Sequence, residues 1–329
     1  MKHKYMKAIV WKKYGSPDYL ELADIEKPVP KDDEVLIKVH AATVTPGDCE
    51  VRRFDMHVLF WIPLRIYFGI FKPRRPILGM ELSGEIEAIG QKVKNFNVGD
   101  RIVCGTSLGF GAHAEYKCLK SNAMIALKPS NMTYEEAASL PTGGTNALHY
   151  LRKGKIQPGE KVLINGAAGC FGTYAIQLAK HFGAEVTCVD STDKLQPLTT
   201  LGADHLIDYT KENFAESDKK YDVIFDVVGK SVRQGMKALT PKGRYILATP
   251  WVYQVIQGFW CSLMSKKKFI IELAKEDPKD LVYLKQLVEE GKLKTVIDKT
   301  FPLSEMAVAH HYVEKGDKVG QVIMKITDQ

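Results

Sequence analysis

Cysteine is scarce in this chain, and the cysteines that it has form no regular pattern. The 329 residues include six of them, widely separated and without a C-x-x-C pair. Such a distribution excludes the disulfide framework of a small secreted domain and is typical of reduced thiols, so we expect a cytoplasmic location. The six are Cys49, Cys104, Cys118, Cys170, Cys188 and Cys261.

Long apolar runs are also missing. Two apolar segments, residues 56–71 and 251–264, are each too short to cross a bilayer, and Pro63 and Arg65 interrupt the first. The first residues, MKHKYMKAIVW, lack the apolar core of a signal peptide. We interpret the two segments as cover for a core or as the lining of an apolar pocket, and we expect no membrane span.

No charge of one sign dominates the chain. The net charge of +7 is modest for this length, and 45% apolar with 26% charged residues is typical of a globular protein with a sizeable core. The chain is long enough for two domains. Its positive surplus favours acidic or phosphorylated ligands but does not by itself indicate nucleic acid, which we do not expect as a partner.

The most informative motif is a glycine-rich turn between a strand and a helix. The apolar strand 161–165 leads into the stretch 166–172 (GAAGCFG), and an amphipathic helical run follows at once. Glycines let the backbone approach a ligand closely, and the N–H groups at a helix start favour a phosphate. A second apolar strand, 185–189, ends in Asp190, where a dinucleotide fold places the residue that reads the adenosine ribose. This order predicts a site for NAD(H) or NADP(H).

Strand and helix patterns divide the chain into unlike parts. Short alternating runs separated by turns predict an irregular β domain up to about residue 128, and Thr133 to Glu136 fits a capping box. Strands and helices then alternate, which implies a parallel sheet covered by helices on both faces. We expect strands at 161–165, 185–189, 205–207, 221–227 and 243–248, and helices at 173–182, 193–201 and 231–239.

The pattern changes again after about residue 267. Helices are expected at 278–290 and 304–315, and strands at 295–301 and 320–326. We expect the last strand to rejoin the first β domain. The predicted division of the chain is therefore 1–128, 129–267 and 268–329, with the third part returning to the first.

Several further motifs occur in a fixed order along the chain. They are Ala41–Asp48 (AATVTPGD), Leu78–Gly84 (LGMELSG), Val98–Val103 (VGDRIV), Gly111–Tyr116 (GAHAEY), Leu140–Ala147 (LPTGGTNA) and Leu201–Asp204 (LGAD). With the glycine turn, they make the chain resemble the medium-chain dehydrogenase/reductase superfamily, and within it the zinc-free quinone oxidoreductase branch. The resemblance implies an α/β fold in which a Rossmann doubly wound parallel sheet is inserted in a GroES-like, β-rich catalytic domain.

The same resemblance shows where metal ligands are missing. Zinc alcohol dehydrogenases hold the metal with Cys, His and Cys and leave a fourth position open. Here Thr45 and Met80 stand at the first two of these positions, and the Thr142/Gly143 region stands at the third. A hydroxyl and a thioether are poor zinc ligands, and the four-cysteine lobe for structural zinc is absent. We therefore expect no metal.

Without a Lewis acid an alcohol is hard to ionise, whereas a quinone or an enone accepts hydride more easily. The resemblance implies hydride transfer from the cofactor and places Thr45 and Asp48 beside the nicotinamide and the substrate. Asp48 either orients its loop by hydrogen bonds, the interpretation that we favour, or assists proton transfer. Arg52, Tyr67 and the apolar segment 56–71 are expected to line or cover the substrate entrance.

The residues expected around the ribose point to two cofactors. Asp190 would accept hydrogen bonds from a ribose 2′-OH and favour NAD. Ser191 can donate to a phosphate, and the resemblance places Lys194 and Tyr209 around the 2′-phosphate of NADP. Lys318 would add positive charge nearby. We favour NADP over NAD, because a lysine–phosphate contact can offset one carboxylate.

The resemblance also assigns the rest of the cofactor site. Two threonines lie on the nicotinamide side, one stretch of backbone cradles the diphosphate, and three residues follow the ends of later strands. These residues are Thr142 and Thr145; Ala168, Gly169, Cys170, Phe171 and Gly172; and Val228, Gly229 and Ala248.

From these observations we expect a zinc-independent reductase of a small hydrophobic quinone or α,β-unsaturated carbonyl. The resemblance implies that it acts as a homodimer. Two other interpretations stay open. One is a metal-free alcohol or aldehyde reductase, and the other is a non-catalytic NADPH-binding sensor or RNA-binding protein. The latter rests on the +7 charge and on the lack of an obvious acid/base pair.

Overall fold

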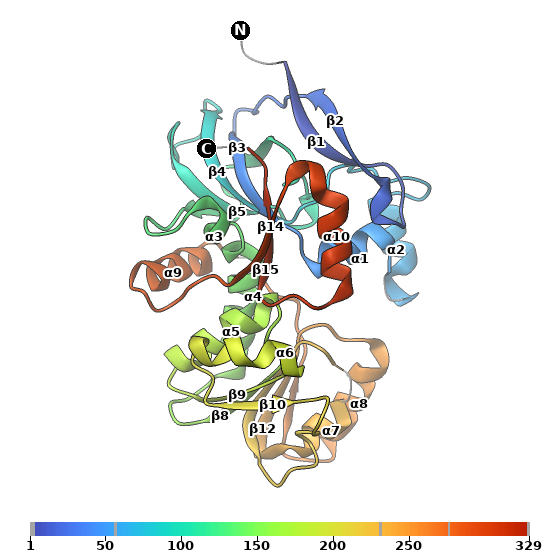
Figure 1. Cartoon of the computed structure of the whole chain (residues 1–329), viewed down its shortest axis with the longest axis vertical. Helices are drawn as coiled ribbons and strands as arrows, with labels where there is room; N and C mark the ends of the chain where they lie inside the picture. The colour runs from blue at the N-terminus through green and yellow to red at the C-terminus, as the bar shows by residue number, and fades with distance from the viewer. Residues whose placement is uncertain (1–3, 56–57, 230–231, 276, 328–329) are drawn as a thin grey trace. The chain divides into compact units, whose positions relative to one another are not determined.

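The computed structural model describes residues 4–55, 58–229, 232–275 and 277–327, and contacts divide it into two units (Figure 1). Unit 1 comprises Met1–Thr142, Asp277–Glu290 and Thr295–Gln329, and unit 2 comprises Gly143–Glu276 and Gly291–Lys294. The chain thus builds most of unit 1, then unit 2, and returns to unit 1. The start of the apolar segment, residues 56–57, and the first residue of one predicted helix, 231, lie outside the described residues.

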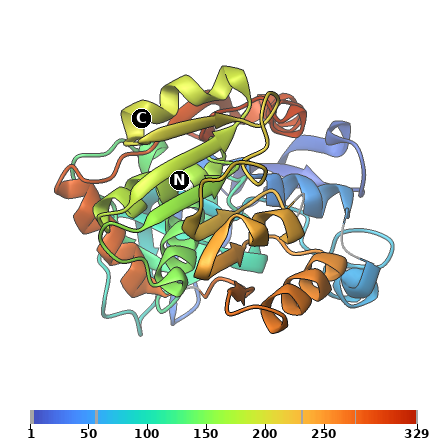
Figure 2. The same ribbon diagram turned by 90° about the horizontal axis from the view of Figure 1, so that it is seen from below.

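Unit 2 is built on a six-stranded parallel sheet (Figure 2). The strands follow the order β10-β9-β8-β11-β12-β13, with the chain running outward in both directions from β8, which is the doubly wound order of dinucleotide-binding folds. Their bounds are β8 Lys161–Asn165, β9 Glu185–Asp190, β10 His205–Asp208, β11 Tyr221–Asp226, β12 Leu239–Leu247 and β13 Lys268–Ile270. The expected Rossmann sheet is therefore confirmed.

The helices of unit 2 connect these strands. They are α4 Thr145–Gly154, α5 Cys170–His181, α6 Thr192–Leu195 with a 3-10 turn at Gln196–Leu201, α7 Val232–Lys237 and α8 Val252–Leu263. The central strands β8, β9 and β11 are almost wholly buried, as expected for a sheet covered on both faces. None of the described helices in either unit is long and apolar enough to cross a membrane.

Unit 1 contains a seven-stranded sheet and a separate hairpin. In the sheet the order is β14-β15-β3-β4-β5-β7, with β6 paired to β3, and β1 pairs with β2. The bounds are β1 Tyr5–Trp11, β2 Leu20–Glu26, β3 Glu34–Thr43, β4 Glu81–Ile89, β5 Arg101–Gly105, β6 Tyr116–Lys120, β7 Ile125–Leu127, β14 Ile297–Pro302 and β15 Gln321–Lys325. Ile323 of β15 pairs with Thr43 of β3, so the last strand rejoins the first β domain as predicted.

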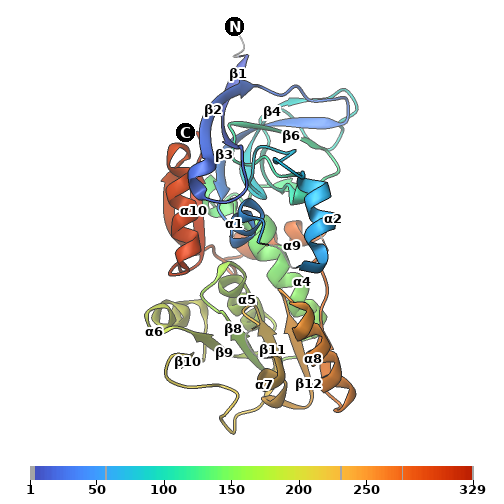
Figure 3. The same cartoon turned by 90° about the vertical axis from the view of Figure 1, so that its right-hand side faces the viewer.

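Helices and short turns complete unit 1. The α-helices are α1 Pro46–Arg53, α2 Val58–Phe68, α3 Tyr134–Ala137, α9 Pro278–Glu289 and α10 Met306–Lys315. The Thr133 hydroxyl accepts a hydrogen bond from the Glu136 N–H at 3.1 Å, and the Glu136 carboxylate accepts one from the Thr133 N–H at 2.8 Å. The predicted capping box is therefore confirmed. Helices α1 and α10 contact each other (Figure 3).

The contacts place the boundaries between the units after Thr142 and after Glu276. Both lie further along the chain than the boundaries at 128 and 267 that the sequence suggested. Helix α3 packs on β3, β4 and β15, and the Thr142 N–H donates to Glu81, so this stretch belongs to unit 1. Helix α9 packs on β7 of the same unit. Alternation of strands and helices does not reveal which of the two cores a connecting helix covers.

Candidate functional site

The glycine turn after β8 is closed tightly by backbone contacts. Gly166 has a φ of +82°, and its N–H donates to the Val189 carbonyl oxygen at the end of β9. A Cβ on Gly172 would lie 2.4 Å from the Ala167 carbonyl oxygen and 2.5 Å from that of Gly166. Glycine is therefore required at both positions, because any side chain would push the turn away from the helix start.

The start of α5 fits an anionic group. Gly169 is the N-cap and has no side chain that could accept the hydrogen bonds of the first turn. The first N–H groups of a helix have no acceptor within the helix, and they lie at the positive end of its dipole. The predicted stretch Ala168, Gly169, Cys170, Phe171 and Gly172 spans the turn and this helix start, here called the cradle. Within it the Ala168 N–H donates to Asp190 and the Gly169 N–H donates to the Gly166 carbonyl oxygen. These residues fit the diphosphate of a dinucleotide.

Asp190 is buried beneath this cradle. Its carboxylate accepts one hydrogen bond from the Ala168 N–H and one from the Ser191 N–H, each at 2.9 Å. The Lys194 ammonium lies 3.8 Å from the same carboxylate, and the side chain of Lys194 is only 19% exposed. The Tyr209 N–H donates to the Asp190 carbonyl oxygen. The structure thus brings together the four residues expected at the ribose.

Asp226, at the end of β11, organises the loop after that strand and was not predicted. One carboxylate oxygen accepts hydrogen bonds from Asn165 Nδ2 at 2.9 Å, Val228 N at 2.9 Å and Gly229 N at 2.8 Å. The Ala248 N–H donates to the Asp226 carbonyl oxygen. Polar residues that end neighbouring buried strands are the signal that would have found it. Thr145, also predicted, begins α4 and is buried.

The hydroxyl of Tyr245 donates to the other carboxylate oxygen of Asp226. Burial, together with the negative charge of Asp226, raises the pKa of Tyr245 well above its usual value. The tyrosine therefore remains a neutral hydrogen-bond donor.

In unit 1, Thr45 and Asp48 form a capping box at the start of α1. The Thr45 hydroxyl accepts from the Asp48 N–H at 3.1 Å and donates to Asp48 Oδ2 at 2.7 Å, and the Thr45 N–H donates to the same oxygen at 3.0 Å. Asp48 Oδ1 accepts from the Gly79 N–H at 3.1 Å. Asp48 is fully buried, so its carboxylate joins two loops and faces no solvent.

Thr45 and Met80, which stand at two of the expected zinc positions, lie near each other in unit 1. A Cβ on Gly47 would lie 3.4 Å from the Met80 sulfur and 3.6 Å from Thr45 Oγ1. The Thr142 N–H donates to Glu81, the residue after Met80, at 2.6 Å. A thioether and a hydroxyl that already bonds Asp48 do not fit zinc. Among the described residues, no group of three His, Cys, Asp or Glu is arranged to hold a metal ion.

Glu81 is a buried carboxyl group beside these positions. Its other oxygen accepts a hydrogen bond from the Thr43 hydroxyl at 2.7 Å. Burial raises the pKa of Glu81 to about 7, although the hydrogen bonds from Thr43 and Thr142 oppose the rise. Glu81 therefore changes its charge near neutral pH, inside unit 1.

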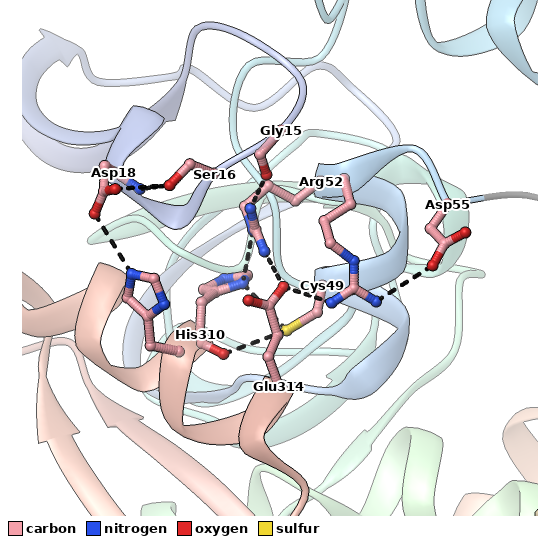
Figure 4. Close-up of polar contacts among 10 residues, drawn as sticks. Gly15, Ser16, Asp18, Cys49, Arg52, Asp55, His310 and Glu314 are labelled. Atoms are coloured by element: carbon pink, nitrogen blue, oxygen red, sulfur yellow. Dashed lines mark hydrogen bonds and ion pairs between the residues drawn. The ribbon is translucent and has the colours of Figure 1, made fainter.

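The expectation that Arg52 lines the substrate entrance is wrong. Arg52 is fully buried, and its guanidinium donates to the Gly15 carbonyl oxygen and to the Glu314 carboxylate (Figure 4). Its Nε lies 3.3 Å from Nδ1 of His310, and the Cys49 sulfur lies 3.3 Å from the same nitrogen. Burial lowers the pKa of His310 well below its usual value, so the ring is neutral and its Nδ1 can accept from the guanidinium. Arg52 thus binds α1 to α10.

Two other predicted residues lie in unit 1. The Lys318 side chain is buried, and its ammonium donates to the Gly320 carbonyl oxygen at 2.6 Å. Tyr67, expected near the substrate entrance, is partly exposed on α2, and its hydroxyl accepts from Arg75 at 2.8 Å.

Comparison with known protein families matches most of the chain. Residues 31–129 match the alcohol dehydrogenase GroES-like domain, and residues 201–324 match a domain described as zinc-binding dehydrogenase. The first match lies within the β-rich part of unit 1. The second begins in unit 2 and ends in the last strand of unit 1.

Characterised relatives cover nearly the whole chain. The chain is 34% identical to 2-methylene-furan-3-one reductase of Solanum lycopersicum, over 97% of this chain and 79% of the relative. It is 31% identical to the chloroplast envelope quinone oxidoreductase homolog of Arabidopsis thaliana, over 99% of this chain and all of the relative. The solved quinone oxidoreductase of Coxiella burnetii superposes with a TM-score of 0.88 at 31% identity, over 98% of this chain and all of that one.

Replacing Gly172 with alanine tests the cradle. We expect Gly172→Ala to weaken NADPH binding at least tenfold, because the new Cβ would collide with two backbone carbonyl oxygens and displace the turn. Isothermal titration calorimetry would measure the dissociation constant. Gly109→Ala is the matched control, since no atom lies within 4 Å of a Cβ at Gly109. Equal affinity in both variants would show that the turn does not hold the cofactor.

The raised pKa of Glu81 predicts a pH-dependent stability. The group titrates near 4.5 when unfolded and near 7 when folded, so its contribution is complete below pH 4.5 and is lost as the pH rises through 7. The loss amounts to about 3 kcal/mol. We expect the free energy of unfolding of Glu81→Gln, measured with urea from pH 5 to 8, to be flatter than that of the wild type. Glu26→Gln, at an exposed position on β2, should keep the wild-type slope.

Proposed function

The chain belongs to the medium-chain dehydrogenase/reductase superfamily, in its quinone oxidoreductase-like branch, and from this membership we propose that it transfers hydride from NADPH to a quinone or an α,β-unsaturated carbonyl. Relatives named as a furanone reductase, an alkenal/one oxidoreductase and quinone oxidoreductases support this substrate class. All of these names describe reductases of conjugated acceptors.

One combination of features carries the proposal: a glycine turn that fits a dinucleotide phosphate occurs in the same chain as poor zinc ligands at the expected metal positions. Gly166, Gly169 and Gly172 allow the turn to pack tightly, which leaves no side chain where a diphosphate would bind. Thr45 and Met80 replace the ligands that an alcohol dehydrogenase would need. A conjugated acceptor is the substrate that can do without a Lewis acid.

When bound, the reduced nicotinamide would supply the hydride. We assign its binding to unit 2 and to Thr142, and the placing of the substrate to the loop of Thr45 in unit 1. In this assignment Asp48 is a positioning residue, because three hydrogen bonds already occupy its carboxylate. The product takes its proton from water or from a polar group at the site. The protein itself supplies position and an apolar environment.

NADP is the proposed cofactor because Asp190 is already neutralised in part. Two backbone N–H groups and the Lys194 ammonium surround its carboxylate, which weakens its repulsion of a 2′-phosphate. Lys194, Ser191 and Tyr209 would bind that phosphate. Lys318 is a poorer candidate, since its ammonium bonds a carbonyl oxygen. The cytoplasmic location and the homodimer remain predictions.

Cofactor oxidation with a panel of acceptors tests the reaction. We expect the purified protein, stripped of metal with a chelator, to oxidise NADPH with quinones and enones and to have a higher kcat/KM for them than for simple aldehydes and ketones. A higher kcat/KM for the simple carbonyls would favour the alcohol or aldehyde reductase instead. Tight NADPH binding without turnover would favour the non-catalytic alternative, and loss of activity on stripping would indicate a metal enzyme.

Lys194→Ala tests the choice of cofactor. We expect the KM for NADPH to rise about tenfold, because the variant loses a charge-assisted contact with the 2′-phosphate, while the KM for NADH stays unchanged. Steady-state rates with both cofactors would measure the effect. Lys211→Ala removes a more exposed lysine that pairs with Asp208, and it should change neither value. An unchanged ratio of the two KM values in Lys194→Ala would refute this assignment.

A further inference from the structure

Helix α8 turns its large apolar side chains outward. Tyr253, Ile256, Trp260 and Leu263 recur at intervals of three and four residues and so share one face of the helix. These residues, with Met264 just beyond the helix, are 54 to 81% exposed. No charged residue lies within α8. A helix of a globular protein normally buries such a face, so this face is expected to have a partner.

The inner face of α8 explains this orientation. Gln254 is buried, and its amide donates to the Gly229 carbonyl oxygen. Gly258 lies so close to the neighbouring strand that a Cβ there would come within 2.3 Å of the Phe269 ring. Only a very small residue fits at that point. These contacts fix the rotation of α8 about its axis, and the apolar face is therefore held outward.

Positive charge is concentrated beside this face. Every charged residue between Asp226 and Glu272 is basic, although the whole chain has a net charge of only +7. Lys266–Lys268 follow directly after α8, and the first and last of these lysines are exposed. Helix α7, which contacts α8 (Figure 1), adds the exposed Arg233 and Lys237. An apolar face and a group of cations thus adjoin each other within unit 2.

We propose that α8, together with Lys266–Lys268, docks unit 2 onto a membrane surface that contains anionic phospholipid. In such a complex the Trp, Tyr, Ile and Leu side chains enter the interfacial region, and the lysines meet the lipid phosphates. The composition of this face fits a protein partner less well, because lysine is depleted at the core of protein interfaces. A nucleic acid would use the charges and Trp260 but would leave Ile256 and Leu263 without apolar cover.

Docking of this kind is independent of the proposed reaction. None of the residues assigned to the cofactor or the substrate lies on the outer face of α8. The helix lies in the plane of the membrane surface and does not cross it. Vesicle binding is measured without turnover. If the protein did not bind vesicles, the proposed reductase activity would still stand.

Sedimentation with lipid vesicles tests the proposal on the full-length protein. We expect the protein to sediment with vesicles of phosphatidylcholine mixed with phosphatidylglycerol, to bind vesicles of pure phosphatidylcholine much more weakly, and to be released by salt. Trp260→Ser should lower the partition coefficient about tenfold on the mixed vesicles. The double variant Lys266→Gln/Lys268→Gln should lower it by a similar factor, mainly on the anionic vesicles.

Matched controls separate the patch from general effects. Val282→Ser alters a similarly exposed apolar residue on α9, and Lys31→Gln/Lys279→Gln removes two exposed lysines of unit 1. We expect both to bind vesicles like the wild type. Because Trp260 is exposed, Trp260→Ser should keep the wild-type unfolding midpoint and affinity for NADPH. These two measurements show that the variant is folded.

Three outcomes would overturn the proposal. One is that the protein does not bind the mixed vesicles, or that Trp260→Ser binds them as tightly as the wild type does. Another is a dimer that Trp260→Ser converts to a monomer, which would mean that a second copy covers the face. The last is binding of single-stranded RNA that competes with vesicles and is lost in Trp260→Ser, which would assign the face to nucleic acid. A homodimer that persists in Trp260→Ser, together with the expected loss of vesicle binding, would support the proposal.

Discussion

Buried loop N–H groups need acceptors, and three carboxylates supply them. Asp190 accepts from Ala168 and Ser191, Asp226 accepts from Val228 and Gly229, and Asp48 accepts from Thr45 and Gly79. An unpaired N–H group in such a place would cost a large part of a domain's stability. The shape of the cofactor cradle and of the Thr45 loop therefore depends on acidic residues that hold backbone in place.

Much of the fold could be predicted because local patterns determine it. Alternating strand and helix patterns predicted the parallel sheet, and each predicted strand of unit 2 is present, while the edge strand β13 was not predicted. Helix α1 was missed, although Thr45 and Asp48 have the spacing of a capping box. The short helix contains proline, glycine and two arginines and has no clear apolar period, so its composition does not predict a helix.

Two other features could not be predicted because they depend on contacts between distant residues. Arg52 is buried because Glu314 and His310 meet it from α10, more than 250 positions along the chain. The sequence around Arg52 does not predict those partners. The apolar composition of residues 251–264 was visible in the sequence, but composition does not say whether a face points inward. Gly258 against Phe269 decides that direction. Sequence patterns thus predicted the elements better than their surroundings.

The carboxyl groups near Thr45 and Met80 are already bonded within the chain. Thr45 uses its hydroxyl to close the loop with Asp48, and Glu81 is bonded by Thr43 and by the backbone of Thr142. Both carboxyl groups are buried and already accept hydrogen bonds, which suits them to hold loops in position. A conjugated acceptor needs neither a Lewis acid nor a dedicated proton donor from such a site. Its reduction gives an anion stabilised by conjugation, which water can protonate, so placement alone is enough for the chemistry.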